Sequence, residues 1–280
     1  MKLIDFDGLF DEKLAQYMEE NKEKYTEKQW ETVIPKLYQK FGDTYVAKVK
    51  CTPKEYYAKM SDAELVETLC GHLTEDVPVP EFLCAELENR DVVEALIPLL
   101  SNADTAVVAY ALNLIGDDKR AYDAYFSVLS DEDADVDIRN DVADIFKLNA
   151  DFVKVRVFAA YKSGIAREYM LEILSRVKER DEEIYQTLLT AFLTDDENVP
   201  MHASYLAAYG DARALKPLLS RIEDRSIGFV EFQELKYAIE ALGGTYDEPR
   251  DFTNDKDYLA VEAAGAAAFN AGNSGNGLKS

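Results

Sequence analysis

Apolar residues recur at helical spacing along most of the chain, and no convincing series of alternating strands is present. One stripe shows the pattern at i, i+4, i+7 and i+11: Trp30, Ile34, Leu37 and Phe41. Thr26 and Gln29 have the spacing of a capping box directly before this stripe. The sequence therefore predicts a helix over Glu27–Phe41 that ends at Gly42, within an all-α chain.

Breaks in the pattern divide the chain into three predicted parts. These are a helical N-terminal region, a series of helix pairs and a C-terminal segment: residues 1–80, 81–250 and 251–280. The first boundary is the proline-containing segment 76–80. In the last part we expect a helix over Asp255–Ala268 and a disordered tail over Ala271–Ser280, which is rich in Gly, Asn and Ser.

Two segments of the middle part align with each other when one residue is inserted. The matched pairs are Gly116 with Gly210, Arg120 with Arg213, Ala121 with Ala214, and Ser127 with Ser220. In each segment an Ala-rich helix ends at a glycine that is free to take a left-handed conformation. The following aspartate is expected to cap the next helix, and that helix is expected to pack back on its predecessor.

This pattern resembles the HEAT repeat family, especially the bilin-lyase-type HEAT-like repeat, which has an Ala-rich helix, Leu-Gly-Asp and then Arg-Ala-hydrophobic. The match is at Gly116-Asp117 and Gly210-Asp211, is weaker at Gly243-Gly244, and covers roughly residues 85–245. Residues 152–196 are helical but depart from the pattern. The resemblance implies a right-handed α-α superhelix, a HEAT-like solenoid, and such repeats mostly bind other proteins.

The charge of the chain restricts its partners. With 31 Lys and Arg against 54 Asp and Glu, the net charge is −23. A chain this acidic repels nucleic acids and anionic membranes, so the predicted partner is another protein. Solubility or a basic partner explains the charge. No stretch has the length of a membrane span. The three cysteines lack zinc or disulfide spacing, and we expect a cytoplasmic protein.

The candidate binding residues come from the second helix of a pair, which lines the concave side in HEAT-like stacks. They are Arg139, Asn140 and Asp144 in one such helix, and Gln233, Glu234 and Lys236 in another. An ordinary solvated helix face explains the same residues equally well. The tyrosines at helical spacing are interpreted as packing residues in most cases.

No motif predicts a catalytic residue, a metal ligand set or a cofactor. Asp5 and Asp7 match the nucleophile motif of haloacid-dehalogenase phosphatases, but the alternating strands of that fold are not predicted, so a capped helix entry is favoured. The acidic segment 131–137 fails as a calcium loop and is interpreted as a capped turn. His72 and His202 have no motif partners and are interpreted as helix-end or packing residues.

The leading hypothesis is a protein-interaction scaffold or adaptor without catalytic activity. The alternative is an enzyme on a HEAT-like frame, of the lyase or glycosylase type, although the charge of −23 counts against a DNA glycosylase. A magnesium-dependent phosphatase that uses Asp5 and Asp7 is the third hypothesis.

Overall fold

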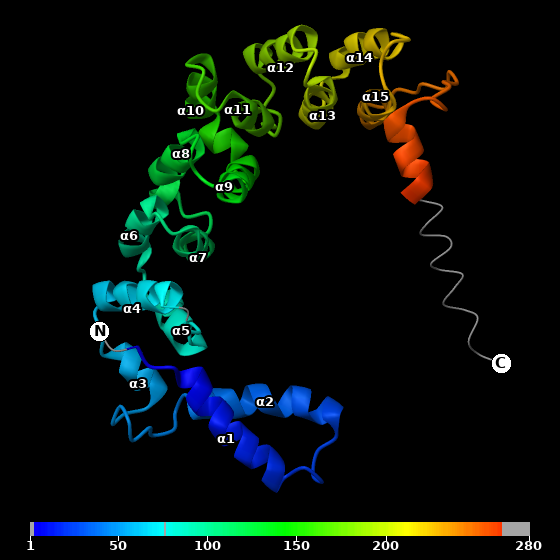
Figure 1. The fold of residues 1–280 in the computed structure, drawn as a ribbon. Helices are drawn as coiled ribbons and strands as arrows, with labels where there is room; N and C mark the ends of the chain where they lie inside the picture. Colours follow the sequence, from blue (N-terminus) through cyan, green and yellow to red (C-terminus); the bar gives the residue numbers. More distant parts are fainter. Residues whose placement is uncertain (1–2, 76, 265–280) are drawn as a thin grey trace, which may run out of the picture. The chain divides into compact units, whose positions relative to one another are not determined.

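The computed structural model describes residues 3–75 and 77–264, and every regular element in these two ranges is a helix (Figure 1). The only extended pairing there is an isolated bridge between Val46 and Cys51. The predicted all-α fold is thus confirmed. None of the described helices combines the length and the apolar character that crossing a bilayer requires.

The chain forms two compact units, one through Val142 and one from Ala143 on, so the division lies inside α9. The predicted boundary at 76–80 falls inside the first unit. The elements up to this division are α1 (Phe6–Glu20), α2 (Glu27–Phe41), α3 (Pro53–Ala58), α4 (Asp62–Thr74), α5 (Glu81–Asn89), α6 (Val93–Leu96), η1 (Ile97–Ser101), α7 (Thr105–Ile115), η2 (Lys119–Ala121), α8 (Tyr122–Ser130) and α9 (Val136–Leu148). The elements after α9 are α10 (Ala150–Lys162), α11 (Arg167–Leu174), α12 (Glu182–Thr194), α13 (Val199–Tyr209), η3 (Ala212–Ala214), α14 (Leu215–Ile222) and α15 (Phe229–Ala241).

Side-chain caps set the helix starts that the sequence predicts. Gln29 accepts a hydrogen bond from the Thr26 backbone N–H at 2.9 Å, and α2 covers the predicted range and ends at Gly42. Ser61 and Glu64 form the equivalent capping box at the start of α4, with distances of 2.7 and 3.3 Å. These contacts satisfy backbone donors that the first helical turn leaves unpaired.

Aromatic side chains fill much of the core of the first unit. Phe6 packs edge-on against Tyr57, with ring centroids 5.7 Å apart, and both side chains are fully buried. Tyr38 of α2 stacks on Phe82 of α5 at 4.7 Å. The packing interpretation of the tyrosines is confirmed for Tyr57, Tyr122, Tyr125, Tyr205 and Tyr209, which are all buried, whereas Tyr237 is exposed.

The second unit is built from helix pairs in two layers. Helices α10, α12 and α14 lie in one layer, and α11, α13 and α15 lie in the other (Figure 1). Each helix of the first layer packs on the helix that follows it, and α13 also packs on α11 and α15. The same pairing therefore runs through residues 152–196, where the sequence pattern departs from the repeat.

The first glycine–aspartate link differs from the prediction at Gly116 and at the aspartate that caps the next turn. Gly210 has the expected left-handed conformation, with a φ angle of 74°, and Asp211 caps η3 through the Arg213 N–H. Gly116 also has a positive φ angle, 60°, but its ψ angle of −135° places it outside the left-handed helical region. After Gly116, however, Asp118 caps η2 through the Arg120 N–H, so the inserted residue is Asp117.

The helix that follows the second link also packs differently from the prediction. We expected α14 to pack back on α13, but its main contact is with α15. The segment 223–228 between α14 and α15 is longer than the Gly210-Asp211 link and gives α15 room to fold back along α14. The glycine–aspartate link therefore connects two helix pairs instead of the two members of one pair.

At each of the two glycine–aspartate links, one arginine binds an acidic residue about one repeat earlier in the chain. Arg120 reaches back 29 residues to Asp91, with hydrogen bonds of 2.9 and 2.6 Å, and also holds Asp118 at 2.7 Å. Arg213 reaches back 31 residues to Glu182 and holds Asp211 at 2.8 Å. The side-chain hydrogen bond from Arg120 lowers the pKa of Asp118 to about 2.

Other arginines at similar separations bind the carbonyl groups at helix ends. Arg90 donates to the carbonyl oxygen of Met60 at 2.7 Å, and Arg180 donates to that of Gly210 at 2.8 Å. Arg250 donates to the carbonyl oxygen of Ile222. Carbonyls in the last turn of a helix have no partner within the helix, so a guanidinium at this position stabilises the helix end.

The C-terminal segment begins with a capped helix. Residues 256–264 are helical, and Asp255 accepts hydrogen bonds from the backbone N–H groups of Asp257 and Tyr258. The predicted start at Asp255 is thus confirmed as a cap. The predicted helix end at Ala268 and the predicted disordered tail over Ala271–Ser280 lie outside the described residues.

Candidate functional site

Three of the predicted binding residues belong to α9. Arg139 is partly buried, and its guanidinium donates to the carbonyl oxygen of Leu129 at the end of α8, at 3.2 Å. Asn140 is exposed. Asp144 is exposed and pairs with Lys147 at 2.5 Å. The contact of Arg139 secures the end of a neighbouring helix, which is a structural role.

The other three predicted binding residues belong to α15. Gln233 and Glu234 fall between Val230 and Tyr237 on one face, because positions i, i+3, i+4 and i+7 share a face of a helix. Val230 is 47% exposed and Tyr237 is 59% exposed. Lys236 points away from this face by its helical position and approaches Glu240 at 3.9 Å. We call Val230, Gln233, Glu234 and Tyr237 the α15 face.

Helix α10 carries a more apolar exposed face, which the sequence analysis did not single out. Phe152 is 62% exposed and Val155 is 77% exposed. Ala159 is also exposed and completes an i, i+3, i+7 spacing. We call these three residues the α10 stripe. Leu148, at the end of α9, is the most exposed large apolar residue described, at 85%.

The two acidic motifs of the sequence have structural roles. Asp5 caps α1 by accepting a hydrogen bond from the Gly8 N–H at 2.7 Å, and Asp7 accepts one from the Tyr38 hydroxyl at 2.6 Å. In the later motif, Asp135 accepts the N–H groups of Asp137 and Ile138 at the start of α9. The interpretation of both motifs as capped helix entries is therefore confirmed.

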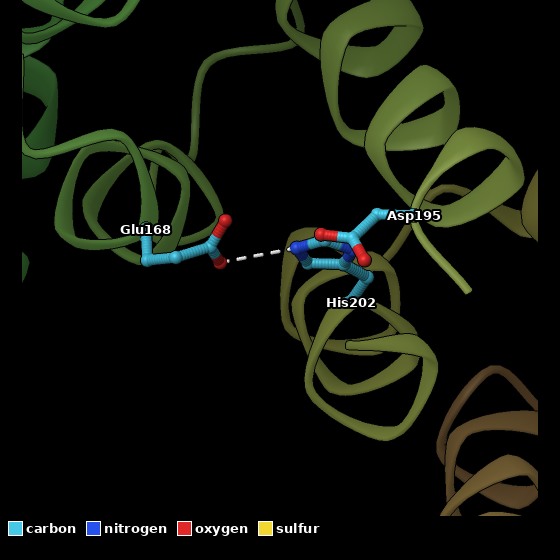
Figure 2. A group of neighbouring side chains, drawn as sticks. All are labelled: Glu168, Asp195 and His202. Atoms are coloured by element: carbon cyan, nitrogen blue, oxygen red, sulfur yellow. Dashed lines mark hydrogen bonds and ion pairs between the residues drawn. The ribbon is translucent and has the colours of Figure 1, made fainter. Parts of the chain in front are cut away.

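The fold brings together three side chains that could bind a metal ion or transfer a proton and that are far apart in the sequence. Glu168 lies in the first turn of α11, Asp195 directly follows α12, and His202 lies in the first turn of α13. Figure 2 shows the Glu168 carboxylate facing the His202 imidazole, with Asp195 beside the ring. One ligand atom from each residue lies within 4.8 Å of the other two.

His202 is the buried centre of this group. Its side chain is 2% exposed, and Nε2 lies 3.0 Å from Oε2 of Glu168 (Figure 2). The second ring nitrogen, Nδ1, is also buried and has no hydrogen-bond partner in the structure. A buried polar atom without a partner destabilises a fold by roughly 1–3 kcal/mol, so this nitrogen needs an explanation.

Asp195 is held in place by its own hydrogen bonds. Its Oδ1 accepts the backbone N–H groups of Glu197 and Asn198, at 3.0 and 3.2 Å, and its Oδ2 accepts the Asn198 side-chain amide at 2.9 Å. The Asn198 amide is the main cause of a lowered pKa of Asp195, and His202 contributes. The aspartate is therefore ionised at neutral pH and can still accept one more interaction.

The imidazole and the two carboxylates offer one nitrogen and two oxygen donors. Such groups can bind a divalent cation or can exchange a proton through the ring. His72 in α4 provides a contrast, since it is equally buried but neither of its ring nitrogens has a hydrogen-bond partner in the structure.

This group was not predictable from the sequence, because its members are far apart in the chain. The histidine itself was placed near a helix end, which is confirmed, but its carboxylate partners were not identified. Glu168 and His202 are 34 residues apart, which is about one helix pair. If the repeat pattern had been recognisable over residues 152–209, it would have predicted that the first turns of α11 and α13 lie side by side. The glycine–aspartate motif that marks the pattern is not found in 152–196.

No protein-family model matches the chain, and no curated protein matches its sequence.

Proposed function

We propose that this chain is a protein-interaction scaffold built from HEAT-like helix pairs, and that it binds its partner through the α10 stripe. The exposed apolar side chains of Phe152 and Val155 carry the proposal. Contiguous apolar side chains on the surface of a folded protein commonly mark sites of association. The layered pairs of the second unit and the arginine contacts at intervals of 29 and 31 residues support the repeat architecture.

The proposed partner is a protein with an apolar anchor and a net positive charge. An aromatic side chain such as Phe152 supplies a large contact area with little conformational freedom to lose. The net charge of −23 attracts a basic protein over distances of about 10 Å at moderate ionic strength. We therefore expect association to slow as salt is added, while the apolar contact controls dissociation.

The experiment compares three variants of the full chain. Phe152→Ser with Val155→Ser alters the α10 stripe, and Val230→Ser with Tyr237→Ser alters the α15 face. Leu193→Ser is the control, because Leu193 is a similarly exposed apolar residue of α12, at 61%. Partners captured from native lysate by the unaltered chain are purified and titrated against each variant.

We expect the α10 variant to bind at least about fivefold more weakly, since loss of an interface anchor costs about 1 kcal/mol or more. The control should bind as the unaltered chain does. Weakening by the α15 variant alone would move the binding face to the helix that the sequence predicted. Equal binding by all three variants, or no saturable partner, would contradict the proposal.

A further inference from the structure

We infer that Glu168, Asp195 and His202 form a binding site for one first-row divalent transition-metal ion of the zinc class. The inference is independent of the proposed protein-binding role, because it rests on a different group of residues. Three features of these residues support a metal site: the distances between the donor atoms, their chemical types, and the burial of the central imidazole.

The distances suit a small ion. Zinc binds imidazole nitrogen and carboxylate oxygen at about 2.0–2.2 Å, so its ligands lie about 3.3 Å apart in a tetrahedral site. Nε2 of His202 and Oε2 of Glu168 are already 3.0 Å apart. All three donor atoms are within 4.8 Å of one another, and the Glu168 side chain is 44% exposed, which leaves it room to adjust its position around an ion.

The donor types select among metal ions. Neutral imidazole is a good ligand for zinc, iron, nickel and copper, whereas calcium and magnesium take oxygen ligands almost exclusively. One imidazole with two carboxylates is therefore a set for a borderline transition metal. Three protein ligands leave a fourth position for water or another ligand, and the half-exposed carboxylate of Glu168 places that position near solvent.

The burial of His202 is the independent observation that points to a ligand. The His202 side chain is only 2% exposed, and Nε2, which lies 3.0 Å from Oε2 of Glu168, is the ring nitrogen that faces this carboxylate (Figure 2). The other carboxylate, Asp195, is fixed by three hydrogen bonds that leave part of Oδ2 available. Donors held in this way by surrounding hydrogen bonds are characteristic of metal sites.

A bound ion would connect three successive elements. Glu168 contributes from α11, Asp195 from the end of α12 and His202 from α13. Because the unfolded chain does not hold these residues together, binding should stabilise the second unit.

The test uses the full chain, freed of metal with a chelator and titrated with Co²⁺ and with Zn²⁺. Co²⁺ reports the coordination through its visible absorption, and Zn²⁺ is followed by calorimetry and by thermal unfolding. The variants are His202→Gln, Glu168→Gln and Asp195→Asn. His72→Gln is the matched control, because His72 is the other buried histidine and has no carboxylate partner in the structure.

We expect one ion per chain, a visible absorption band with Co²⁺ and a raised Tm with Zn²⁺. His202→Gln should abolish the band, each carboxylate variant should weaken binding at least tenfold, and His72→Gln should change neither. Excess Mg²⁺ should not displace Co²⁺. If His202→Gln does not fold, the two carboxylate variants decide the matter, since both side chains are partly exposed.

Two results would overturn the inference. One is the absence of binding at one ion per chain. The other is binding that the three variants leave unchanged, which would indicate adventitious binding to the acidic surface.

Discussion

The two histidines of this chain are buried to the same degree, yet their surroundings differ. His72 lies in the last turn of α4 in the first unit, and neither ring nitrogen has a hydrogen-bond partner in the structure. His202 lies in the first turn of α13 in the second unit, near the carboxylates of Glu168 and Asp195 (Figure 2). The comparison shows that burial alone does not make a histidine functional, whereas convergence of charged donors on it makes it chemically useful.

Replacing each histidine with leucine should give the largest difference, because the free energy of unfolding should change in opposite directions. We expect His72→Leu to raise the free energy of unfolding by about 1 kcal/mol, because it removes two unpaired buried nitrogens. In metal-free protein, His202→Leu should lower it by about 1–3 kcal/mol, since the hydrogen bond with the Glu168 carboxylate is lost. Hydrogen exchange over residues 62–74 and 199–209 measures each local effect. Shifts of the same sign would contradict the comparison.

Loss of a neighbouring cap should affect both regions about equally. Ser61→Ala removes the cap of the helix that carries His72, and Asp195→Ala removes the hydrogen bonds that precede α13. Each change should lower local stability by about 1 kcal/mol. Only Asp195→Ala should weaken Co²⁺ binding. Hydrogen exchange measures the loss of the cap in both variants, and the Co²⁺ spectrum shows which of the two residues is also a metal ligand. Weaker Co²⁺ binding by Ser61→Ala would show that the spectrum follows general stability.

The smallest expected difference is in the response to acid. Hydrogen bonding by the Asn198 amide lowers the pKa of Asp195 in the folded chain. The resulting stabilisation is fully present above the unfolded value of about 3.9 and is lost as the pH falls through the lower folded value. Exchange of α13 amides should therefore accelerate below about pH 4, relative to amides of α4.

Asp195→Asn provides the control for this acid response. It should reduce the pH dependence of α13, because the asparagine side chain does not ionise in this range. An unchanged pH dependence in this variant would assign the acid response to other carboxylates. Candidates in the second unit include Asp211, whose pKa is lowered by its hydrogen bond with Arg213.

The helical elements were largely predictable because their determinants are local. The capping pair of Thr26 and Gln29 and the apolar stripe that follows it define α2 to the residue. Likewise, the positive φ angles at Gly116 and Gly210 follow from the need for a residue without a side chain at a helix end. Local chemistry did not reveal that Asp118, and not Asp117, caps the next turn, because either residue can do so in isolation.

The candidate sites were less predictable because they depend on packing. Gln233 and Glu234 were chosen for their position in a helix pair, and the structure adds exposed Val230 and Tyr237 beside them. The α10 stripe was not selected, because Phe152 and Val155 look like core residues when only their hydrophobicity is considered. Which face of α10 is covered depends on where α11 packs, and this is a property of the folded chain.

By itself, the sequence determined that this protein is helical, where several helices begin and end, and that its surface is strongly acidic. These properties arise from spacing, capping and composition, which act over a few residues or over the whole chain. Only the tertiary structure decided that Glu168, Asp195 and His202 meet and that the α10 stripe is exposed. Both depend on the packing of neighbouring helices, which brings together residues that are up to 34 positions apart.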